Sequence, residues 1–276
     1  MTDKYAVIGN PIAHSKSPLI HQMFARQTGL DIRYEKIEAP LNGFADTIER
    51  LRKEGYKGCN VTVPFKQQAF QLASEFAFEA GFAHASNTLE FKGDQIKAYN
   101  TDGIGLLRDI EQHHHVNWRG KRILLMGAGG AAKGVATQIA SLLLSQLPGT
   151  TLVIANRTAE KAHQLARACN PDARVKGCGY GDLYDQQFDV VINATSSGLS
   201  DELPPLPPGI FAPGALAYDM MYGRETPFMK FAMEQGAAIV ADGLGMLVEQ
   251  AAETFRIWYP GSILDTASVI AKLRTP

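Results

Sequence analysis

A glycine-rich turn is the part of the chain whose residue types and spacing point most directly to chemistry. It follows the apolar run 123–126 and precedes a long helical pattern. Its spacing matches the dinucleotide fingerprint G-x-G-x-x-G/A, in which small residues allow a tight turn and close approach of a pyrophosphate to the backbone. Free N–H groups at the following helix N-terminus would bind the phosphates. The alternative is a glycine-rich turn without a ligand, and the position between a strand and a helix favours the dinucleotide site. The residues expected to contact the cofactor here are Gly127, Ala128, Gly129, Gly130 and Ala131, with Ala132 as the third small residue of the fingerprint.

The residues after the next strand indicate which dinucleotide to expect. An NAD enzyme usually has Asp or Glu there, which binds the ribose 2′-hydroxyl. This chain has Asn156, Arg157 and Thr158 after the apolar run 152–155, with Lys161 one helical turn later. Arg and Lys attract a 2′-phosphate, and Thr158 can donate a hydrogen bond to it. The pattern favours NADP over NAD; the alternative is that Thr158 caps a helix and the basic residues are solvated.

Lys66 and Asp102 are the residues best suited to moving a proton. Lys66 is expected in the first turn of a helix, where the dipole disfavours a cation and makes its proton easier to lose. Asp102 either caps the next helix or pairs with Lys66 and holds the ammonium in place. The alternative for Lys66 is an ordinary exposed lysine.

A further polar segment lies near the N-terminus. Ser17 suits the N-cap of a helix, and Pro18 suits its first position, where a missing N–H costs nothing. Ser15, together with that helix N-terminus, could instead form a neutral, donor-rich pocket for a carboxylate. Thr62 lies at the carboxyl end of the predicted strand 59–63, where open α/β sheets bind ligands.

The histidine run 113–115 does not predict a metal site. Consecutive residues do not share a helix face, and the chain is expected to leave its helix here, so a solvated surface run is predicted. Cys59, Cys169 and Cys178 form neither a C-x-x-C pair nor a zinc spacing. Their odd count fits a reducing cytoplasm.

Length and composition narrow the class of protein. The chain has 276 residues, is 45% hydrophobic and carries a formal net charge of −1, which suits one large globular domain or two ordinary ones. The charge balance gives no reason to expect nucleic acid or a membrane surface as a partner. No signal-peptide layout is seen at the N-terminus, and no apolar run approaches the roughly 18 residues of a membrane span. A cytoplasmic protein is expected.

Strand and helix patterns alternate along the chain, which is typical of an α/β fold with mainly parallel sheets. The fingerprint lies far from the N-terminus, so two domains separated by a cleft are predicted. Residues 1–102, completed by C-terminal helices in 246–276, would bind substrate and carry the catalytic groups. Residues 103–245 would form a Rossmann-type NADP-binding domain, with the connections near Gly103 and Gly243 acting as a hinge. The expected strands are 5–8, 32–37, 59–63, 87–91, 95–99, 123–126, 152–155, 190–192, 215–219 and 237–241; the expected helices are 17–29, 43–54, 66–78, 104–112, the glycine turn to about 147, 159–169, 248–259 and 266–273.

Several motifs, in this order, resemble those of the shikimate dehydrogenase family over nearly the whole chain. Besides the glycine turn they are residues 9–18 (GNPIAHSKSP), 60–66 (NVTVPFK), 87–88 (NT), 100–103 (NTDG), 156–158 (NRT), 193–196 (NATS), 218–220 (YDM) and 242–251 (DGLGMLVEQA). The resemblance implies reversible reduction of 3-dehydroshikimate to shikimate by NADPH, in the route through chorismate to aromatic amino acids. The chain departs from the family at 84–86 (HAS) and at Lys133.

The resemblance also implies roles for single residues. Lys66 and Asp102 become the catalytic pair, and such general acid–base help is typically worth about 10²–10⁴-fold in rate. The implied substrate contacts are Ser15, Ser17, Asn60, Thr62, Lys66, Asn87, Asp102, Tyr222 and Gln250. The implied contacts to the ribose and nicotinamide are Thr195, Met220, Gly243 and Met246.

Two alternative functions stay open. One is a quinate/shikimate dehydrogenase with broader substrate or NAD use; the hydroxyls of Ser15 and Ser17 and the presence of Arg157 favour shikimate and NADP. The other is a non-catalytic NADPH-binding regulator, which would need neither Lys66 nor Asp102, although both are present. A monomer or homodimer is expected.

Overall fold

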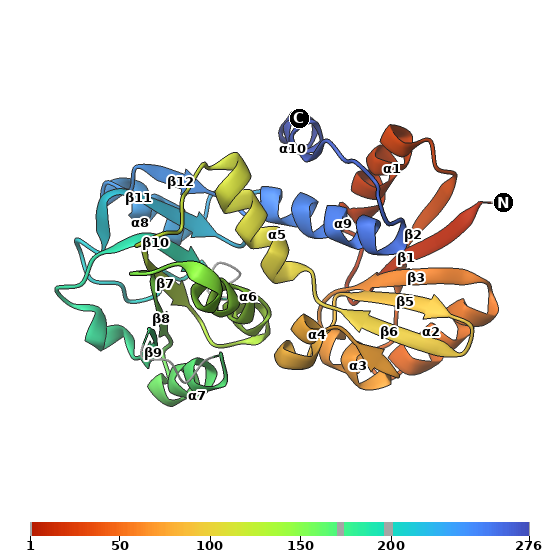
Figure 1. Cartoon of the computed structure of the whole chain (residues 1–276), viewed down its shortest axis with the longest axis horizontal. Coiled ribbons are helices and arrows are strands. Elements are labelled where there is room, and N and C mark those ends of the chain that lie inside the picture. The colour runs from red at the N-terminus through yellow and green to blue at the C-terminus, as the bar shows by residue number, and fades with distance from the viewer. Residues whose placement is uncertain (1, 170–173, 196–200, 276) are drawn as a thin grey trace. The chain divides into compact units, whose positions relative to one another are not determined.

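The chain divides into two compact units. The computed structural model describes residues 2–169, 174–195 and 201–275, without the side chains of 142–146. One unit comprises Met1–Gly105 with Leu247–Pro276, and the other comprises Leu106–Met246 (Figure 1). The assignment of substrate and cofactor to these units stays a prediction.

The first unit is built on a six-stranded mixed sheet. Its strand order is β2-β1-β3-β5-β6-β4, with β1 parallel to β2 and β3, and β5 antiparallel to β3 and β6. The strands are β1 (Asp3–Gly9), β2 (Ile32–Glu38), β3 (Tyr56–Val61), β4 (Glu75–Phe76), β5 (Thr88–Lys92) and β6 (Gln95–Tyr99). The helices of this unit are α1 (Ser17–Thr28), α2 (Phe44–Lys53), α3 (Lys66–Leu72), α4 (Phe78–Ala83), α10 (Thr266–Arg274) and most of α9 (Leu244–Trp258).

Apolar packing holds these elements against the sheet. Phe44 of α2 stacks on Phe65 just before α3, with ring centroids 4.9 Å apart, and both are buried. At the end of α9, Trp258 stacks on Tyr5 of β1 and its indole N–H donates to the Leu89 carbonyl at 3.4 Å. The C-terminal part of α9 is therefore fixed to the sheet of the first unit, at β1 and β5.

Two expectations about the first unit are wrong. The helix predicted over 66–78 ends at Leu72, because the chain becomes extended and the Ser74 N–H donates to the Ile96 carbonyl at 2.9 Å, beside the pairing of β4 with β6. Ser17 is not the N-cap of α1 but its first residue; Lys16 takes the cap position, and the Ser17 N–H donates to Ser15 Oγ at 3.3 Å.

The second unit carries a six-stranded, wholly parallel sheet in the order β12-β11-β10-β7-β8-β9. Read from β9, this is the 3-2-1-4-5-6 order of doubly wound dinucleotide-binding sheets. The strands are β7 (Arg122–Met126), β8 (Thr151–Ala155), β9 (Val175–Cys178), β10 (Phe188–Asn193), β11 (Phe211–Asp219) and β12 (Ile239–Ala241). The helices are α6 (Gly130–Gln146), α7 (Ala159–Cys169) and α8 (Pro227–Glu234), with a 3₁₀ turn over Tyr180–Leu183. The predicted α/β class with mainly parallel sheets is confirmed.

The sequence analysis missed two elements of this unit, β9 and α8. β9 is four residues long and contains Lys176 and Gly177, so it lacks the apolar alternation that reveals a strand. The start of α8 does have a sequence signal, because a threonine, Thr226, directly precedes the proline at the first helical position. In the structure Thr226 Oγ1 caps the helix by accepting from the Met229 N–H at 3.3 Å.

Two helices extend across the boundary between the units. α5 (Asp102–Arg108) begins in the first unit and continues into a π-helical turn over Asp109–His113 in the second. α9 begins in the second unit and continues into the first. Both helices start earlier in the chain than the predicted ranges 104–112 and 248–259.

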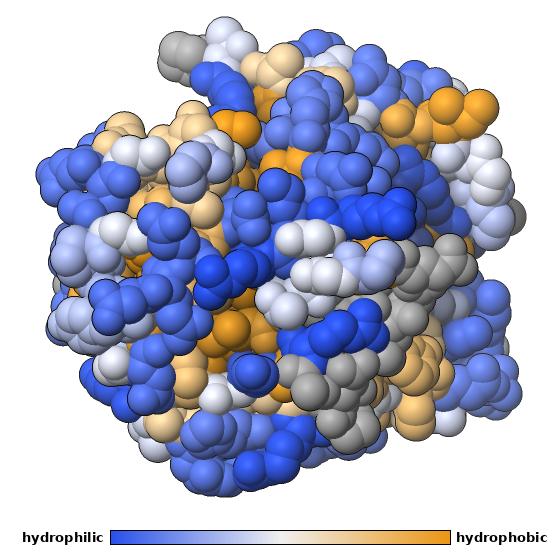
Figure 2. Space-filling view, turned by 60° about the vertical axis from the view of Figure 1, so that its left-hand side comes forward, coloured by the Kyte–Doolittle hydropathy of each residue, from blue (hydrophilic) through white to orange (hydrophobic). Residues whose placement is uncertain are grey.

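The face of the molecule drawn in Figure 2 is largely polar. On the face drawn in Figure 2, hydrophobic colour is confined to separate patches between hydrophilic residues. Within the described part of the chain, no helix combines the length and apolarity that crossing a membrane requires.

Candidate active site

Lys66 and Asp102 form an ion pair in the first unit. Lys66 is the first residue of α3 and Asp102 is the first residue of α5, and Lys66 Nζ lies 2.6 Å from Asp102 Oδ2. The lysine side chain is 28% exposed and the aspartate side chain 11%. The predicted pairing is therefore present, with the ammonium accessible and the carboxylate behind it.

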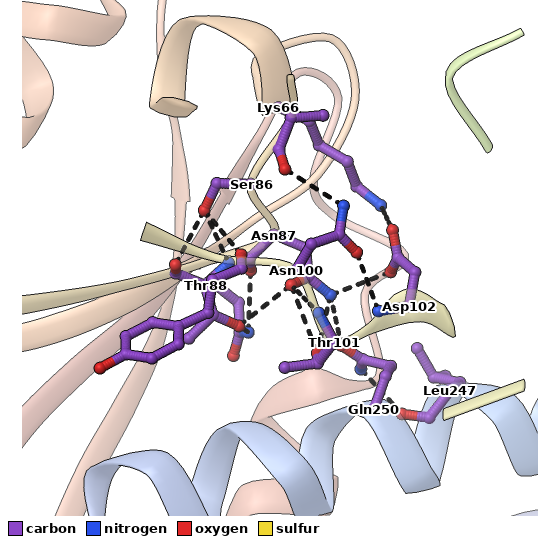
Figure 3. A network of polar contacts seen from close by, with 12 residues as sticks. Lys66, Ser86, Asn87, Thr88, Asn100, Thr101, Asp102, Leu247 and Gln250 are labelled. Atoms are coloured by element: carbon purple, nitrogen blue, oxygen red, sulfur yellow. Dashed lines mark hydrogen bonds and ion pairs between the residues drawn. The ribbon is translucent and has the colours of Figure 1, made fainter. Parts of the chain in front are cut away.

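Asn87 holds the other oxygen of that carboxylate. Its Nδ2 lies 2.9 Å from Asp102 Oδ1, 2.9 Å from Thr101 Oγ1 and 3.1 Å from Gln250 Oε1 (Figure 3). An amide nitrogen carries two hydrogens, so three acceptors compete for two donors. The longest of the three contacts, to Gln250, is the one most readily exchanged for a ligand.

The backbone around the pair is fixed as well. The Asp102 N–H donates to Asn100 Oδ1 at 3.1 Å, and the Thr101 N–H donates to Asn87 Oδ1 at 2.9 Å. The Ser86 N–H donates to the Lys66 carbonyl at 2.8 Å. Both members of the ion pair are thus tied to the segment that carries Asn87.

A buried polar layer lies below these groups. Asn60 Nδ2 lies within 3.2 Å of the Asn87 carbonyl, Thr88 Oγ1 and Thr254 Oγ1, and its Oδ1 accepts from the Tyr34 hydroxyl at 2.7 Å. Thr254 reaches this layer from α9 and lies 2.7 Å from Thr88 Oγ1. Asn60 therefore supports Asn87 from beneath.

Ser15, Ser17 and Thr62 lie at the carboxyl edge of the same sheet. Thr62 directly follows β3, and its N–H donates to the Ile8 carbonyl of β1 at 2.9 Å. A Cβ on Gly9 would lie 2.6 Å from Thr62 Cγ2, so only glycine lets the two strand ends approach this closely. Ser17 is buried and Ser15 half-buried.

The glycine turn of the second unit has the geometry that its spacing predicts. Gly127 follows β7 with φ +107°, a conformation that favours glycine, and a Cβ there would lie 3.0 Å from the Ala194 carbonyl oxygen. A Cβ on Gly129 or Gly130 would meet nothing within 4 Å. Open space thus lies in front of the N-terminus of α6, which fits a dinucleotide pyrophosphate.

The basic segment follows β8, the strand beside β7. Asn156 Nδ2 donates to the Thr158 carbonyl at 3.0 Å, so Asn156 shapes the turn. Arg157, Thr158 and Lys161 are exposed. Their side chains are free to meet a 2′-phosphate, in keeping with the NADP prediction.

The residues expected near the ribose and nicotinamide follow β10 and β11 or lie at the start of α9. Thr195 Oγ1 donates to Asn193 Oδ1 at 2.7 Å; Ser196 of the same motif lies outside the described residues. A Cβ on Gly243 would lie 2.3 Å from the Met220 carbonyl oxygen, so these two backbones touch. Met246 is buried in the first turn of α9, and Tyr222 is half-buried in the loop after β11.

The histidine run 113–115 is only partly a solvated surface. His115 is exposed, but His114 is half-buried, with its ring edge-on to Tyr218 and its Nε2 3.8 Å from Asp109 Oδ2. The prediction was wrong for His114 because the π-helical turn brings it back against the second unit. Within residues 2–169, 174–195 and 201–275, no group of three His, Cys, Asp or Glu side chains is placed to hold a metal ion.

Sequence reasoning missed Thr101, Thr254 and Ser86 as members of the polar network. Thr101 stood inside the Asn100–Gly103 motif, but no spacing links Thr254 to Thr88 across 166 positions. Fold and site together define a class, namely a two-unit α/β protein in which one unit carries a doubly wound dinucleotide-type sheet and the other carries a lysine–aspartate ion pair within a polar network.

Comparison with known proteins identifies the family. The model of the shikimate dehydrogenase substrate binding domain matches residues 7–89, and that of shikimate / quinate 5-dehydrogenase matches residues 109–200. The shikimate dehydrogenase (NADP(+)) of Methylobacillus flagellatus is 56% identical, with 99% of each chain covered. The chain belongs to the shikimate dehydrogenase family.

Solved structures share the whole fold. An Ael1 enzyme from Pseudomonas putida superposes with a TM-score of 0.92 at 46% identity, covering 100% of this chain and 99% of that one. A shikimate dehydrogenase from Thermus thermophilus, solved in complex with NADP(H) and shikimate, superposes with a TM-score of 0.85 at 28% identity, covering 99% of both.

Proposed function

We propose that this protein is an NADP-dependent shikimate dehydrogenase that reversibly reduces 3-dehydroshikimate to shikimate. The observation that carries the proposal is the Lys66–Asp102 ion pair, bordered by the amide and hydroxyl groups of Asn87, Thr101 and Gln250. A ring with several hydroxyls needs such a set of donors and acceptors around one proton donor. The family to which the chain belongs agrees with this chemistry.

Lys66 acts as the acid in the reducing direction. NADPH supplies the hydride when it is bound, and negative charge then develops on the substrate carbonyl oxygen. The Lys66 ammonium gives its proton to that oxygen and takes it back in the reverse reaction. Asp102 fixes the ammonium, and Asn87 fixes Asp102, so the donor needs little reorganisation at the moment of transfer.

The remaining residues of the first unit bind and orient the substrate. Ser15 and Ser17 are neutral donors suited to its carboxylate, and Thr62, Asn87 and Gln250 are suited to its hydroxyls, with Asn60 supporting Asn87 from beneath. Tyr222 is a further proposed contact to the substrate; burial raises the pKa of its phenol, so it stays a hydrogen-bond donor. Positioning of this kind is the larger task of an enzyme that transfers a hydride.

The second unit binds NADP. The turn Gly127–Ala131 and the N-terminus of α6 hold the pyrophosphate. Arg157, Thr158 and Lys161 hold the 2′-phosphate, with Asn156 shaping their turn. Thr195, Met220, Gly243 and Met246 line the ribose and nicotinamide side. We place the enzyme in the cytoplasm, which its three free cysteines support. We expect it to be a monomer or homodimer.

The test is the absorbance of NADPH formed from NADP⁺ and shikimate by the purified protein, repeated with quinate and with NAD⁺. The proposal expects turnover with shikimate and NADP⁺ and a kcat/KM at least about tenfold lower when either partner is replaced. Equal rates with quinate or NAD⁺ would identify the broader enzyme. Cofactor binding without any turnover would identify a non-catalytic regulator.

A further inference from the structure

The carboxylate of Asp109, which lies 3.8 Å from His114 Nε2, is buried in the second unit against the start of α9. Asp109 is the first residue of the π-helical turn after α5 and is 1% exposed. Tyr218, near the end of β11, is fully buried, and its hydroxyl donates to Asp109 Oδ2 at 2.5 Å. Burial and the neighbouring Asp109 carboxylate raise the pKa of Tyr218 well above its ordinary value, so the phenol remains a donor.

The same two side chains meet the backbone of α9. A Cβ on Gly245 would lie 1.9 Å from Asp109 Oδ1, so the carboxylate rests where any other residue would place a side chain. The backbone of Met246 opposes the rise in the pKa of Tyr218 slightly, which places the start of α9 beside the Tyr218 hydroxyl. The helix dipole also favours a carboxylate that lies beside the N-terminus of a helix, as Asp109 lies beside α9. The Asp109–Tyr218 pair therefore packs directly against the first turn of α9.

This pair joins the two helices that carry proposed active-site residues. Asp102 begins α5, and the π-helical turn with Asp109 continues directly from it. Met246 lies in the first turn of α9, and Gln250 follows one turn later, within about 6 Å along the axis of a continuous helix. A shift or rotation of the first turn of α9 would move both Met246 and Gln250.

We propose that Asp109 and Tyr218 are positioning residues that set the place of α9, and through it of Met246 and Gln250, relative to the helix that begins with Asp102. The proposal rests on the proposed function, because the positions of Met246 and Gln250 affect turnover only if these residues contact cofactor and substrate. A merely structural pair would hold the second unit together without affecting turnover in the folded enzyme.

The experiment compares Tyr218→Phe with a matched control, Thr150→Val. Thr150 is also a fully buried hydroxyl of the second unit, accepting from the Gly120 N–H at 2.9 Å and donating to the Trp118 carbonyl at 2.8 Å. It precedes β8 at the amino edge of the sheet, whereas the glycine turn lies at the carboxyl edge. Each variant loses one buried, hydrogen-bonded hydroxyl, so both are expected to lose stability.

Two readouts are needed, the steady-state kinetics with shikimate and NADP⁺ and the hydrogen exchange of backbone amides in α9. Tyr218→Phe should lower kcat/KM by about tenfold, because the hydrogen bond that it removes is made to a charged group. It should also speed amide exchange over residues 245–248. Thr150→Val should leave kcat/KM within about twofold of the original and leave this exchange unchanged.

A second variant covers the case in which Tyr218→Phe does not fold. Asp109→Asn keeps the shape and an acceptor for Tyr218 but removes the charge at the start of α9, and it should change both readouts in the same direction. Unchanged kcat/KM in a folded variant, or a loss equal to that of Thr150→Val, would overturn the proposal. If the original protein does not oxidise shikimate, the proposed function fails by itself, and unchanged exchange over 245–248 would still refute the anchoring.

Discussion

Asn87 Nδ2 lies 2.9 Å from Asp102 Oδ1, while Lys66 Nζ lies 2.6 Å from Asp102 Oδ2. Each oxygen of the carboxylate therefore has its own partner, and the two partners come from different parts of the chain. A carboxylate that accepts a hydrogen bond at one oxygen and an ion pair at the other is held in one orientation. Asn87 thus supports the proposed proton donor, Lys66, through Asp102. It is also a proposed substrate contact.

The first prediction concerns Asn87→Ala. The variant leaves Asp102 with one partner and frees Thr101 and Gln250, so kcat/KM for shikimate should fall by about 10–100-fold and the free energy of unfolding by about 2 kcal/mol. Steady-state kinetics and urea unfolding measure these effects. Asn42→Ala, at an exposed asparagine of the first unit, is the control and should change neither. Full activity in Asn87→Ala would show that Asp102 needs no second partner.

The second prediction concerns the choice of cofactor. Arg157→Ala removes a guanidinium from the proposed 2′-phosphate site, so the KM for NADP⁺ should rise by about tenfold while the low activity with NAD⁺ stays unchanged. Arg167→Ala is the matched control, because Arg167 is also exposed and pairs with Glu160 at 2.9 Å on α7. An equal rise in KM for both cofactors would contradict a role at the 2′-phosphate.

The third prediction concerns the stability of the first unit at low pH. His21 of α1 is fully buried and stacks on Tyr34 at 4.3 Å, and neither ring nitrogen forms a hydrogen bond with any described residue. Burial lowers the pKa of His21 to about 3, and the neighbouring Asn60 opposes this shift only partly. The imidazole is neutral in the folded protein over most of the acid range.

The unfolded chain binds a proton at this residue below pH ~6.5, whereas the folded chain does so only near pH 3. The contribution of neutral His21 to the free energy of unfolding is therefore fully present above pH ~6.5. It is lost as the pH falls toward 3, by up to ~1.4 kcal/mol per pH unit. Urea unfolding of the original protein and of His21→Phe at several values between pH 7 and pH 4 measures the difference. Identical slopes against pH would contradict a buried neutral histidine.

Much of the fold follows from local signals in the sequence. Gly127 marks the turn after β7 because its φ of +107° favours glycine, and the parallel order of the second sheet follows from the alternation of strands and helices. The end of α3 did not follow, because the pairing of Ser74 with Ile96 is a tertiary event that helical spacing does not record.

The site divides in the same way. Lys66 and Asp102 were predictable as a pair, because both stand at the start of a helix and their charges are complementary. Thr254 was not predictable, because α9 brings it to Thr88 from the far end of the chain. Asp109 and Tyr218 carry no sequence motif of their own and are found only by their contact.

The most direct test of the account is the rate of NADPH formation from shikimate and NADP⁺ by Lys66→Met. Lys92→Met is the matched control, because Lys92 also belongs to the first unit and pairs with a carboxylate, Glu90, at 2.9 Å. If Lys66 carries the proton, kcat should fall by about 10²–10⁴-fold in Lys66→Met, with the protein still folded, while Lys92→Met stays within about twofold of the original. A kcat in folded Lys66→Met that equals that of Lys92→Met would contradict the account.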